Sequence, residues 1–217
     1  MTRNALLIID GHRRAMPNFL VKNYSEFDFL RSYRLLDGAR ILNAGSASVR
    51  YGTNCVNIDI QQKPNVDIVC DLHALPASLG LFDAVVCNAV LQYCSEPQRV
   101  ADEFARVLKP GGLLFVDAPW VQPSCPDTPD RYRFSSDALR SIFTRSLEIV
   151  EIGPSIRPGS AFAMLGVEIA ANLTTNRWAN FLSRQVVQVL LWPFRHVQSA
   201  APERTAGAFY LIARKPG

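Results

Sequence analysis

The middle of the chain alternates short apolar, β-branched runs with stretches that repeat hydrophobic residues at helical spacing. This alternation predicts a doubly wound α/β sheet whose strands are mostly parallel. Seven runs are suitable as strands: 40–44, 55–60, 66–70, 82–86, 112–118, 147–152 and 208–213.

Three segments carry the spacing of amphipathic helices, at about 25–36, at 96–108 and from 135 to 143. In the second, apolar residues recur at i, i+4, i+7 and i+8, which places them on one face. Ser135 or Ser136 can cap the third helix. These helices fit between the predicted strands as crossover connections.

Composition favours one folded unit over 1–217, because 217 residues with 48% hydrophobic content can bury a full core around a sheet. The five cysteines are odd in number and form no CxxC pair, so we expect reduced thiols. No signal-peptide pattern and no apolar run of membrane-spanning length stands out. We therefore expect a cytoplasmic protein.

Small and acidic residues follow three of the predicted strands, where open α/β sheets bind ligands. The small-residue run 43–48 follows the first strand and allows close approach to the backbone. Asp59 ends the second strand and can accept both hydroxyls of a ribose, while Asp71 and the neighbouring backbone can read an adenine. A tight turn and helix caps are the alternative explanations.

Five motifs, in this order, make residues 40–143 resemble the class I S-adenosylmethionine-dependent methyltransferases. They are the turn at Gly45, the strand end at Asp59, Asp71-Leu72, Phe82-Asp83, and Leu108-Lys109-Pro110-Gly111-Gly112. More narrowly, the runs 71–76 and 130–135 resemble a bacterial subgroup, similar to the methyltransferase-11 type, that is often associated with polysaccharide and glycolipid assembly.

The resemblance implies a Rossmann-like sheet with an antiparallel last strand, and S-adenosylmethionine as cofactor. The residues it assigns to the cofactor are Asn43, Gly45, Ser46, Asp59, Ile60, Asp71, Leu72 and Asn88. Two departures concern the first motif. The family normally has a carboxylate at the position of Asn43, and further glycines at those of Ala47 and Val49.

Methyl transfer from a sulfonium is an in-line displacement that requires positioning but no metal. The candidate catalytic residues are Tyr93, Asp130 and Arg133. A tyrosine with its ordinary pKa of about 10 is a poor base, so Tyr93 is interpreted as a wall or hydrogen-bond donor, with plain packing as the alternative. Asp130 and Arg133 can bind the acceptor or pair with each other to fix the proline-rich loop 119–130. His12, His73 and His196 lack metal-ligand spacing, so we expect no metal.

A helical insertion is expected at 155–205, before the last strand. Within it, 178–197 is apolar and aromatic with arginine neighbours, and Pro193 should end its helix. Peripheral contact with the inner face of a membrane is one hypothesis. A cover for the acceptor pocket and a homo-oligomer interface are the others.

The main functional hypothesis is methyl transfer by in-line displacement to a small-molecule, glycan or glycolipid acceptor, with a hydroxyl as the expected nucleophile. The alternative is a degenerate methyltransferase fold that acts as a binding or scaffold protein. A nicotinamide-dependent oxidoreductase is disfavoured by the missing GxGxxG. No nucleic-acid reader motif is recognisable, so nucleic acid is not an expected partner.

Overall fold

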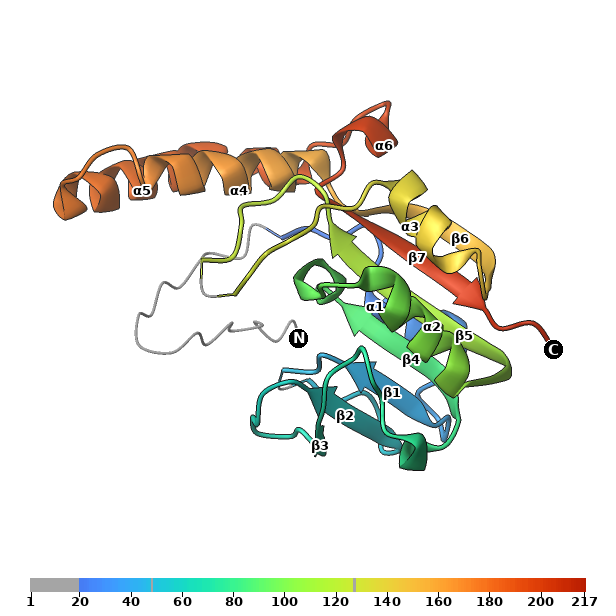
Figure 1. The fold of residues 1–217 in the computed structure, drawn as a ribbon. Helices are drawn as coiled ribbons and strands as arrows, with labels where there is room; N and C mark the ends of the chain where they lie inside the picture. The colour runs from blue at the N-terminus through green and yellow to red at the C-terminus, as the bar shows by residue number, and fades with distance from the viewer. Residues whose placement is uncertain (1–19, 48, 127) are drawn as a thin grey trace.

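The computed structural model describes residues 20–47, 49–126 and 128–217, and a seven-stranded sheet forms its centre (Figure 1). The strands are β1 (Ile41–Ala44), β2 (Cys55–Asp59), β3 (Ile68–Val69), β4 (Phe82–Asn88), β5 (Leu108–Pro119), β6 (Glu148–Ile156) and β7 (Ala208–Arg214). Their order is β3-β2-β1-β4-β5-β7-β6, and only β7 runs antiparallel to its neighbours. The predicted Rossmann-like architecture with an antiparallel last strand is confirmed.

Helices cover both faces of the sheet. They are α1 (Glu26–Ser32), α2 (Pro97–Val107), α3 (Ser136–Phe143), α4 (Pro158–Ala170), α5 (Arg177–Leu191) and α6 (Pro202–Thr205), with 3-10 turns η1 (Ala77–Leu79), η2 (Leu91–Tyr93) and η3 (Pro193–His196). Phe104 of α2 and Phe143 of α3 belong to one buried cluster, and Phe29 of α1 stacks on Phe115 of β5 in the other. The α4–α5 pair projects away from the sheet (Figure 1).

Some helix and strand ends differ from the sequence predictions, because backbone conformation or strand pairing determines where the element ends. The first helix ends at Ser32, not near residue 36, because Arg34 adopts a positive φ of 53° that an α-helix cannot contain. β6 extends two residues into the predicted 155–205 insertion, because Ile156 still pairs with Ala208. The predicted end of the helix before Pro193 is confirmed.

The crossover from β1 to β2 is a loop of residues 45–54, in which none of the described residues is helical. Asn43 on β1 and Asn57 on β2 both donate their side-chain amide to the carbonyl oxygen of Val49, at 2.8 and 2.9 Å. Tyr51, a residue of the same loop, is buried in the core. Buried amides thus hold a short loop over the sheet face where a helix usually packs.

None of the helices in the described part of the chain combines the length and the hydropathy needed to cross a bilayer.

Candidate functional site

The turn after β1 is hydrogen-bonded to the end of β2. The N–H groups of Gly45 and Ser46 both donate to the carbonyl oxygen of Ile58 at 2.9 Å, and the N–H of Ala47 donates to the Asp59 carboxylate at 3.1 Å. The N–H of Cys70 donates to the carbonyl oxygen of Asp59 at 3.1 Å. The carboxyl ends of β1, β2 and β3 therefore lie together at one edge of the sheet.

Gly45 occupies a position that only glycine fills without strain. Its φ is 73°, and a Cβ added there would lie 2.4 Å from Cγ2 of Val90, the second residue after β4. The turn and the segment after β4 are thus in direct contact.

Ser46 carries the buried polar group of this turn that has no partner among the described residues. The residue is only 4% exposed, and the unpartnered group is its side-chain hydroxyl. A buried hydroxyl without a partner is costly, which makes a bound polar group the natural explanation.

Asp59 lies at the end of β2, as predicted, but its carboxylate already has several partners. It accepts hydrogen bonds from the N–H groups of Ala47 and Gln61, and the ammonium of Lys63 lies 3.3 Å away. Ile60, the next residue, is exposed at the same edge. The Asp59 carboxylate thus stabilises the turn after β1.

The side-chain amide of Asn43 donates hydrogen bonds within the protein. Its amide nitrogen donates to Val49 and, at 3.3 Å, to the side-chain oxygen of Asn57. The side chain therefore anchors the loop 45–54, and an acidic residue at this position would repel both acceptors.

Asp71 and Leu72 follow β3 and complete this edge. The Asp71 carboxylate accepts hydrogen bonds from the backbone N–H and the ring of His73. These bonds, the backbone one foremost, lower the pKa of Asp71 below its usual range. The other ring nitrogen of His73 faces the N–H of Glu96 at 3.2 Å, so this histidine joins the β3 end to the start of α2.

A buried charged cluster beside Asn88 is the part of the site that the sequence analysis missed. The ammonium of Lys22 lies 3.1 Å from Asp117 on β5, 3.0 Å from Glu26 and 3.5 Å from the amide oxygen of Asn88. Ser155 on β6 donates to the other oxygen of Asp117 at 2.8 Å. An aspartate inside the otherwise apolar run 113–118 was the available sequence signal.

Two carboxylates share one ammonium in this cluster. Burial raises the pKa of Asp117, against the opposing effect of Lys22. Burial alone would lower the pKa of Lys22, but Asp117 and Glu26 outweigh it, so that pKa is raised. Perturbed groups at strand ends are typical of functional sites, although structural ion pairs also show such shifts.

The three candidate catalytic residues come together where the loop after β5 meets η2. Arg133 holds Asp130 through both guanidinium prongs, at 2.5 and 2.7 Å, and Asp130 also accepts from the N–H of Cys125 at 3.0 Å. The N–H of Arg131 donates to the carbonyl oxygen of Gln92, beside Tyr93. Burial raises the pKa of Tyr93, so its phenol stays protonated at neutral pH and is not available as a base.

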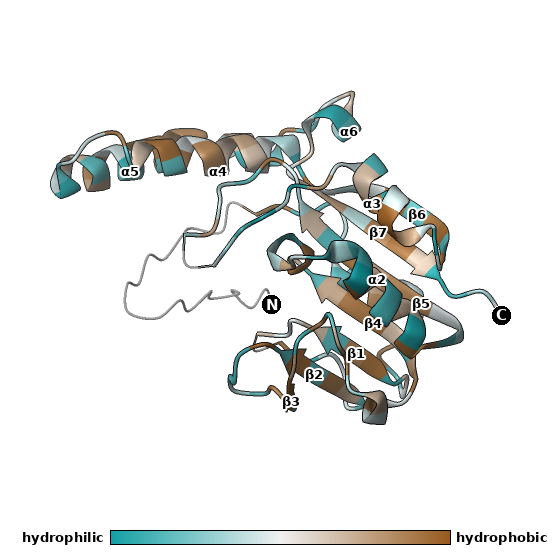
Figure 2. Cartoon of the chain, viewed as in Figure 1, coloured by the Kyte–Doolittle hydropathy of each residue, from teal (hydrophilic) through white to brown (hydrophobic). Residues whose placement is uncertain are grey.

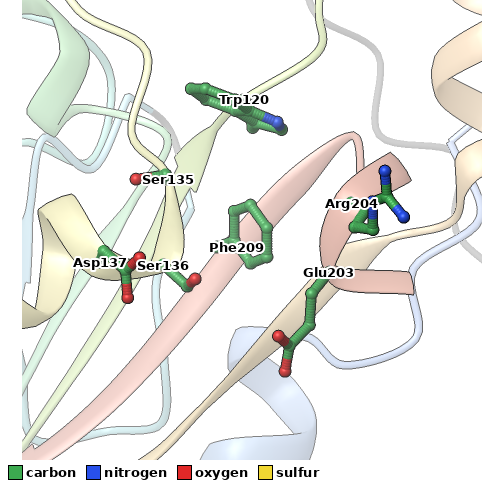
Figure 3. A pocket seen from close by; sticks show the side chains of 7 residues that line it. All are labelled: Trp120, Ser135, Ser136, Asp137, Glu203, Arg204 and Phe209. Atoms are coloured by element: carbon green, nitrogen blue, oxygen red, sulfur yellow. The ribbon is translucent and has the colours of Figure 1, made fainter. Parts of the chain in front are cut away.

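A hollow of about 420 Å³ opens beside the carboxyl end of β5 (Figure 3). It is lined by Trp120, Ser135, Ser136, Asp137, Glu203, Arg204 and Phe209. These residues come from the loop after β5, the start of α3, the short helix α6 and β7. The lining combines two aromatic side chains with carboxylates, hydroxyls and one guanidinium, which suits a polar organic molecule.

Over the described ranges, no three His, Cys, Asp or Glu side chains lie together as a metal site would need. His196 contacts Nε of Arg195 at 2.9 Å. His12, Ser48 and Asp127 lie outside the described residues.

The fold and its strand-end site define a class I methyltransferase fold. Residues 43–116 match the family model described as "Methyltransferase domain", and this range runs from within β1 into β5 and contains the five motifs that suggested the family. Over this range the chain is therefore similar to methyltransferase domains.

Curated relatives are similar over part of their length. The ubiquinone biosynthesis O-methyltransferase of Xylella fastidiosa (strain M23) is 29% identical over 43% of this chain and 47% of that protein. The corresponding protein of Xanthomonas campestris pv. campestris (strain B100) is 30% identical over 43% and 48%. The chain spans about half the length of these relatives.

Solved structures share the fold at low identity. The [4+2]-cyclase SpnF has a TM-score of 0.57 and 22% identity, covering 87% of this chain and 79% of that one. A second similar structure is 1,6-didemethyltoxoflavin-N1-methyltransferase of Burkholderia thailandensis, solved with bound 1,6-didemethyltoxoflavin and S-adenosylhomocysteine. Its TM-score is 0.52 with 13% identity, covering 87% of this chain and 76% of that one.

Proposed function

We propose that the protein is an S-adenosylmethionine-dependent methyltransferase acting on a hydroxyl of a small-molecule, glycan or glycolipid acceptor. The observation that carries the proposal is the buried, unpartnered hydroxyl of Ser46 at the strand-end turn of a matched methyltransferase domain. The turn after β1 and the carboxyl ends of β2 and β3 together provide the arrangement that a nucleoside requires.

The residues present fit the adenosine half of the cofactor best. Asp59 would accept ribose hydroxyls once the Lys63 side chain moves aside, and Asp71 with Leu72 would border the base. Ser46 would bond a polar atom of the cofactor, whose sulfonium supplies the electrophilic methyl group. Asn88 and the segment after β4 would orient the acceptor toward that group.

Tyr93 and the Asp130–Arg133 pair are proposed as positioning groups. With a raised pKa, the Tyr93 phenol stays neutral and donates a hydrogen bond. The two-pronged pair fixes the loop that borders the acceptor side. Neither positioning role requires a side chain that acts as a base with a lowered pKa.

The hollow beside Trp120 is proposed as the acceptor pocket. A sugar ring can lie on the indole face, while Asp137 and Glu203 accept hydrogen bonds from its hydroxyls. The names of the curated relatives support oxygen as the nucleophile, and the bacterial subgroup resemblance supports a role in polysaccharide biosynthesis. All five cysteines are free, which favours a reducing, cytoplasmic setting.

A binding or scaffold protein on the same fold is the second candidate. Asn43 is engaged with its own chain, and Asp59 already has partners, so the site resembles one that has lost part of its cofactor contacts. The similarity to a [4+2]-cyclase illustrates that this fold does not dictate one reaction.

Calorimetric titration with S-adenosylmethionine, S-adenosylhomocysteine and NAD tests the proposal, using Ser46→Ala beside Ser141→Ala, an exposed serine on α3. We expect micromolar binding of the first two ligands and none of NAD. Ser46→Ala should keep or raise stability, because it removes an unpaired buried hydroxyl, and should weaken binding about five- to tenfold, the equivalent of about one hydrogen bond.

Ser141→Ala should bind as the parent does. Absence of binding to either adenosyl ligand would favour the scaffold function. If binding is present and Ser46→Ala leaves it unchanged, Ser46 is not part of the cofactor site. A screen of glycan and lipid-linked acceptors then separates turnover from binding alone.

A further inference from the structure

The α4–α5 hairpin buries small residues and exposes large ones. A Cβ on Gly166 would lie 2.5 Å from Cδ1 of Leu191, and one on Gly159 would lie 1.8 Å from the carbonyl oxygen of Phe194. The Ser183 hydroxyl donates to the carbonyl oxygen of Ala170 across the pair. Close approach through small residues and a hydroxyl bond between helices is typical of helices packed in lipid.

The exposed face of α5 is mostly apolar from Trp178 to Leu190, with Gln185 as a polar residue within it. None of the helix is buried, and only Val187 and Leu191 pack against the small cluster on α4. The exposed apolar side chains are Trp178, Phe181, Leu182, Val186, Val189 and Leu190. Figure 2 shows the hydrophobic colouring recurring along both helices of the projecting hairpin. Six large apolar side chains exposed together on one helix mark an interaction surface.

The charges of the hairpin distinguish between two possible partners for this surface, a second copy of the chain and a lipid surface. The hairpin and the segment after it, residues 158–202, contain three arginines, at 177, 184 and 195, and one acidic residue, Glu168. A second copy related by two-fold symmetry would bring two surfaces of net positive charge together. An anionic lipid surface instead supplies the charge opposite to this net positive charge.

The dimensions indicate how such a contact would lie. With 15 residues, α5 is about 22 Å long, less than the roughly 30 Å of a bilayer core. Trp178 and Trp192 stand at its two ends, and the Trp192 ring carries the guanidinium of Arg195 at 3.5 Å. Indole rings prefer the headgroup level, so both ends favour a helix lying in the interface.

We propose that the outer face of the α4–α5 hairpin docks on an anionic phospholipid surface, with α5 lying in the headgroup region. The apolar side chains enter the acyl boundary, and the arginines contact lipid phosphates. The inference rests on the hairpin alone and does not depend on methyl transfer. If methyl transfer also holds, the enzyme would meet acceptors that reside at the membrane.

Sedimentation with phosphatidylcholine vesicles, with and without phosphatidylglycerol, tests the proposal. The full chain should bind the mixed vesicles, with little binding to phosphatidylcholine alone. Val189→Asp places a charge at a position that is 73% exposed and should reduce binding about tenfold or more. Val150→Asp, at a 44% exposed position on β6, makes the same change elsewhere and should leave binding unchanged.

Arg177→Gln provides a second variant that leaves the apolar face intact. Removing one arginine near an anionic surface should weaken binding about fivefold, and raised salt should act in the same direction. Trp178, which is 78% exposed, should shift its fluorescence to the blue on mixed vesicles and be quenched by brominated lipid. Light scattering without lipid provides the oligomeric state.

Failure of the full chain to sediment with mixed vesicles at low salt overturns the proposal. Equal binding by Val189→Asp and Val150→Asp also overturns it, because the hairpin is then not the contact. A stable dimer that Val189→Asp dissociates, without vesicle binding, would assign the face to a second copy.

Discussion

Replacing Gly45 by alanine tests the contact between the turn after β1 and the segment after β4. The substitution combines two costs. A φ of 73° costs an alanine roughly 1 kcal/mol, and a methyl group 2.4 Å from Cγ2 of Val90 adds about 1–3 kcal/mol of overpacking. We expect Gly45→Ala to lower the free energy of unfolding by about 2–4 kcal/mol.

Two further variants separate these costs in urea denaturation at 25 °C. Gly38 has a φ of 91° with no atom within 4 Å of an added Cβ, so Gly38→Ala should show the backbone cost alone, about 1 kcal/mol. Val90→Ala removes the two clashing methyl groups, so the double variant with Gly45→Ala should recover about 1–2 kcal/mol relative to additivity. Additive effects, or a Gly45→Ala cost no larger than that of Gly38→Ala, would refute the contact.

Three further outcomes follow from single groups. Asn43→Asp should destabilise the protein by about 2–3 kcal/mol in the same assay, because it replaces a donor to the Val49 carbonyl with a buried acceptor; unchanged stability would contradict that bond. The hydrogen bond from Arg133 lowers the pKa of Asp130, so this pair stabilises the fold above about pH 4 and its contribution is lost as the pH falls further. Asp130→Asn should therefore reduce the loss of stability between about pH 4 and lower pH. Burial raises the pKa of Cys94 to about 11, so a thiol reagent at pH 8 should modify Cys94 only after unfolding, as peptide mass mapping would show.

Strand positions and the helix over 97–107 could be predicted from the sequence, because their apolar periods are local and strong. Helix α3 begins where Ser135 caps it, through a hydrogen bond from the N–H of Ala138 to its hydroxyl. The end of α1 was not predictable, since the apolar pattern continues to residue 36 while Arg34 takes a positive φ. That conformation depends on packing that no local pattern records.

The strand-end carboxylates were also predictable, because parallel strands bring their carboxyl ends to one edge of the sheet. The partners of those side chains were not. Lys22 reaches Asp117 across 95 positions of sequence, and the role of Asn43 depends on Asn57 on the neighbouring strand. Such contacts follow from the register of the finished sheet.

The loop that connects β1 to β2 links the fold to the choice of cofactor. In dinucleotide-binding folds the helix after the first strand directs its N-terminus at the pyrophosphate. The described residues of 45–54 form no helix here, so the turn at Gly45 presents backbone N–H groups already bonded to Ile58 and no helix dipole. A pyrophosphate would lose its main binding partner at this edge. S-adenosylmethionine has no phosphate and carries a positive sulfonium, which a helix N-terminus would disfavour. The short crossover therefore weakens the binding of a nicotinamide dinucleotide more than the binding of a methyl donor.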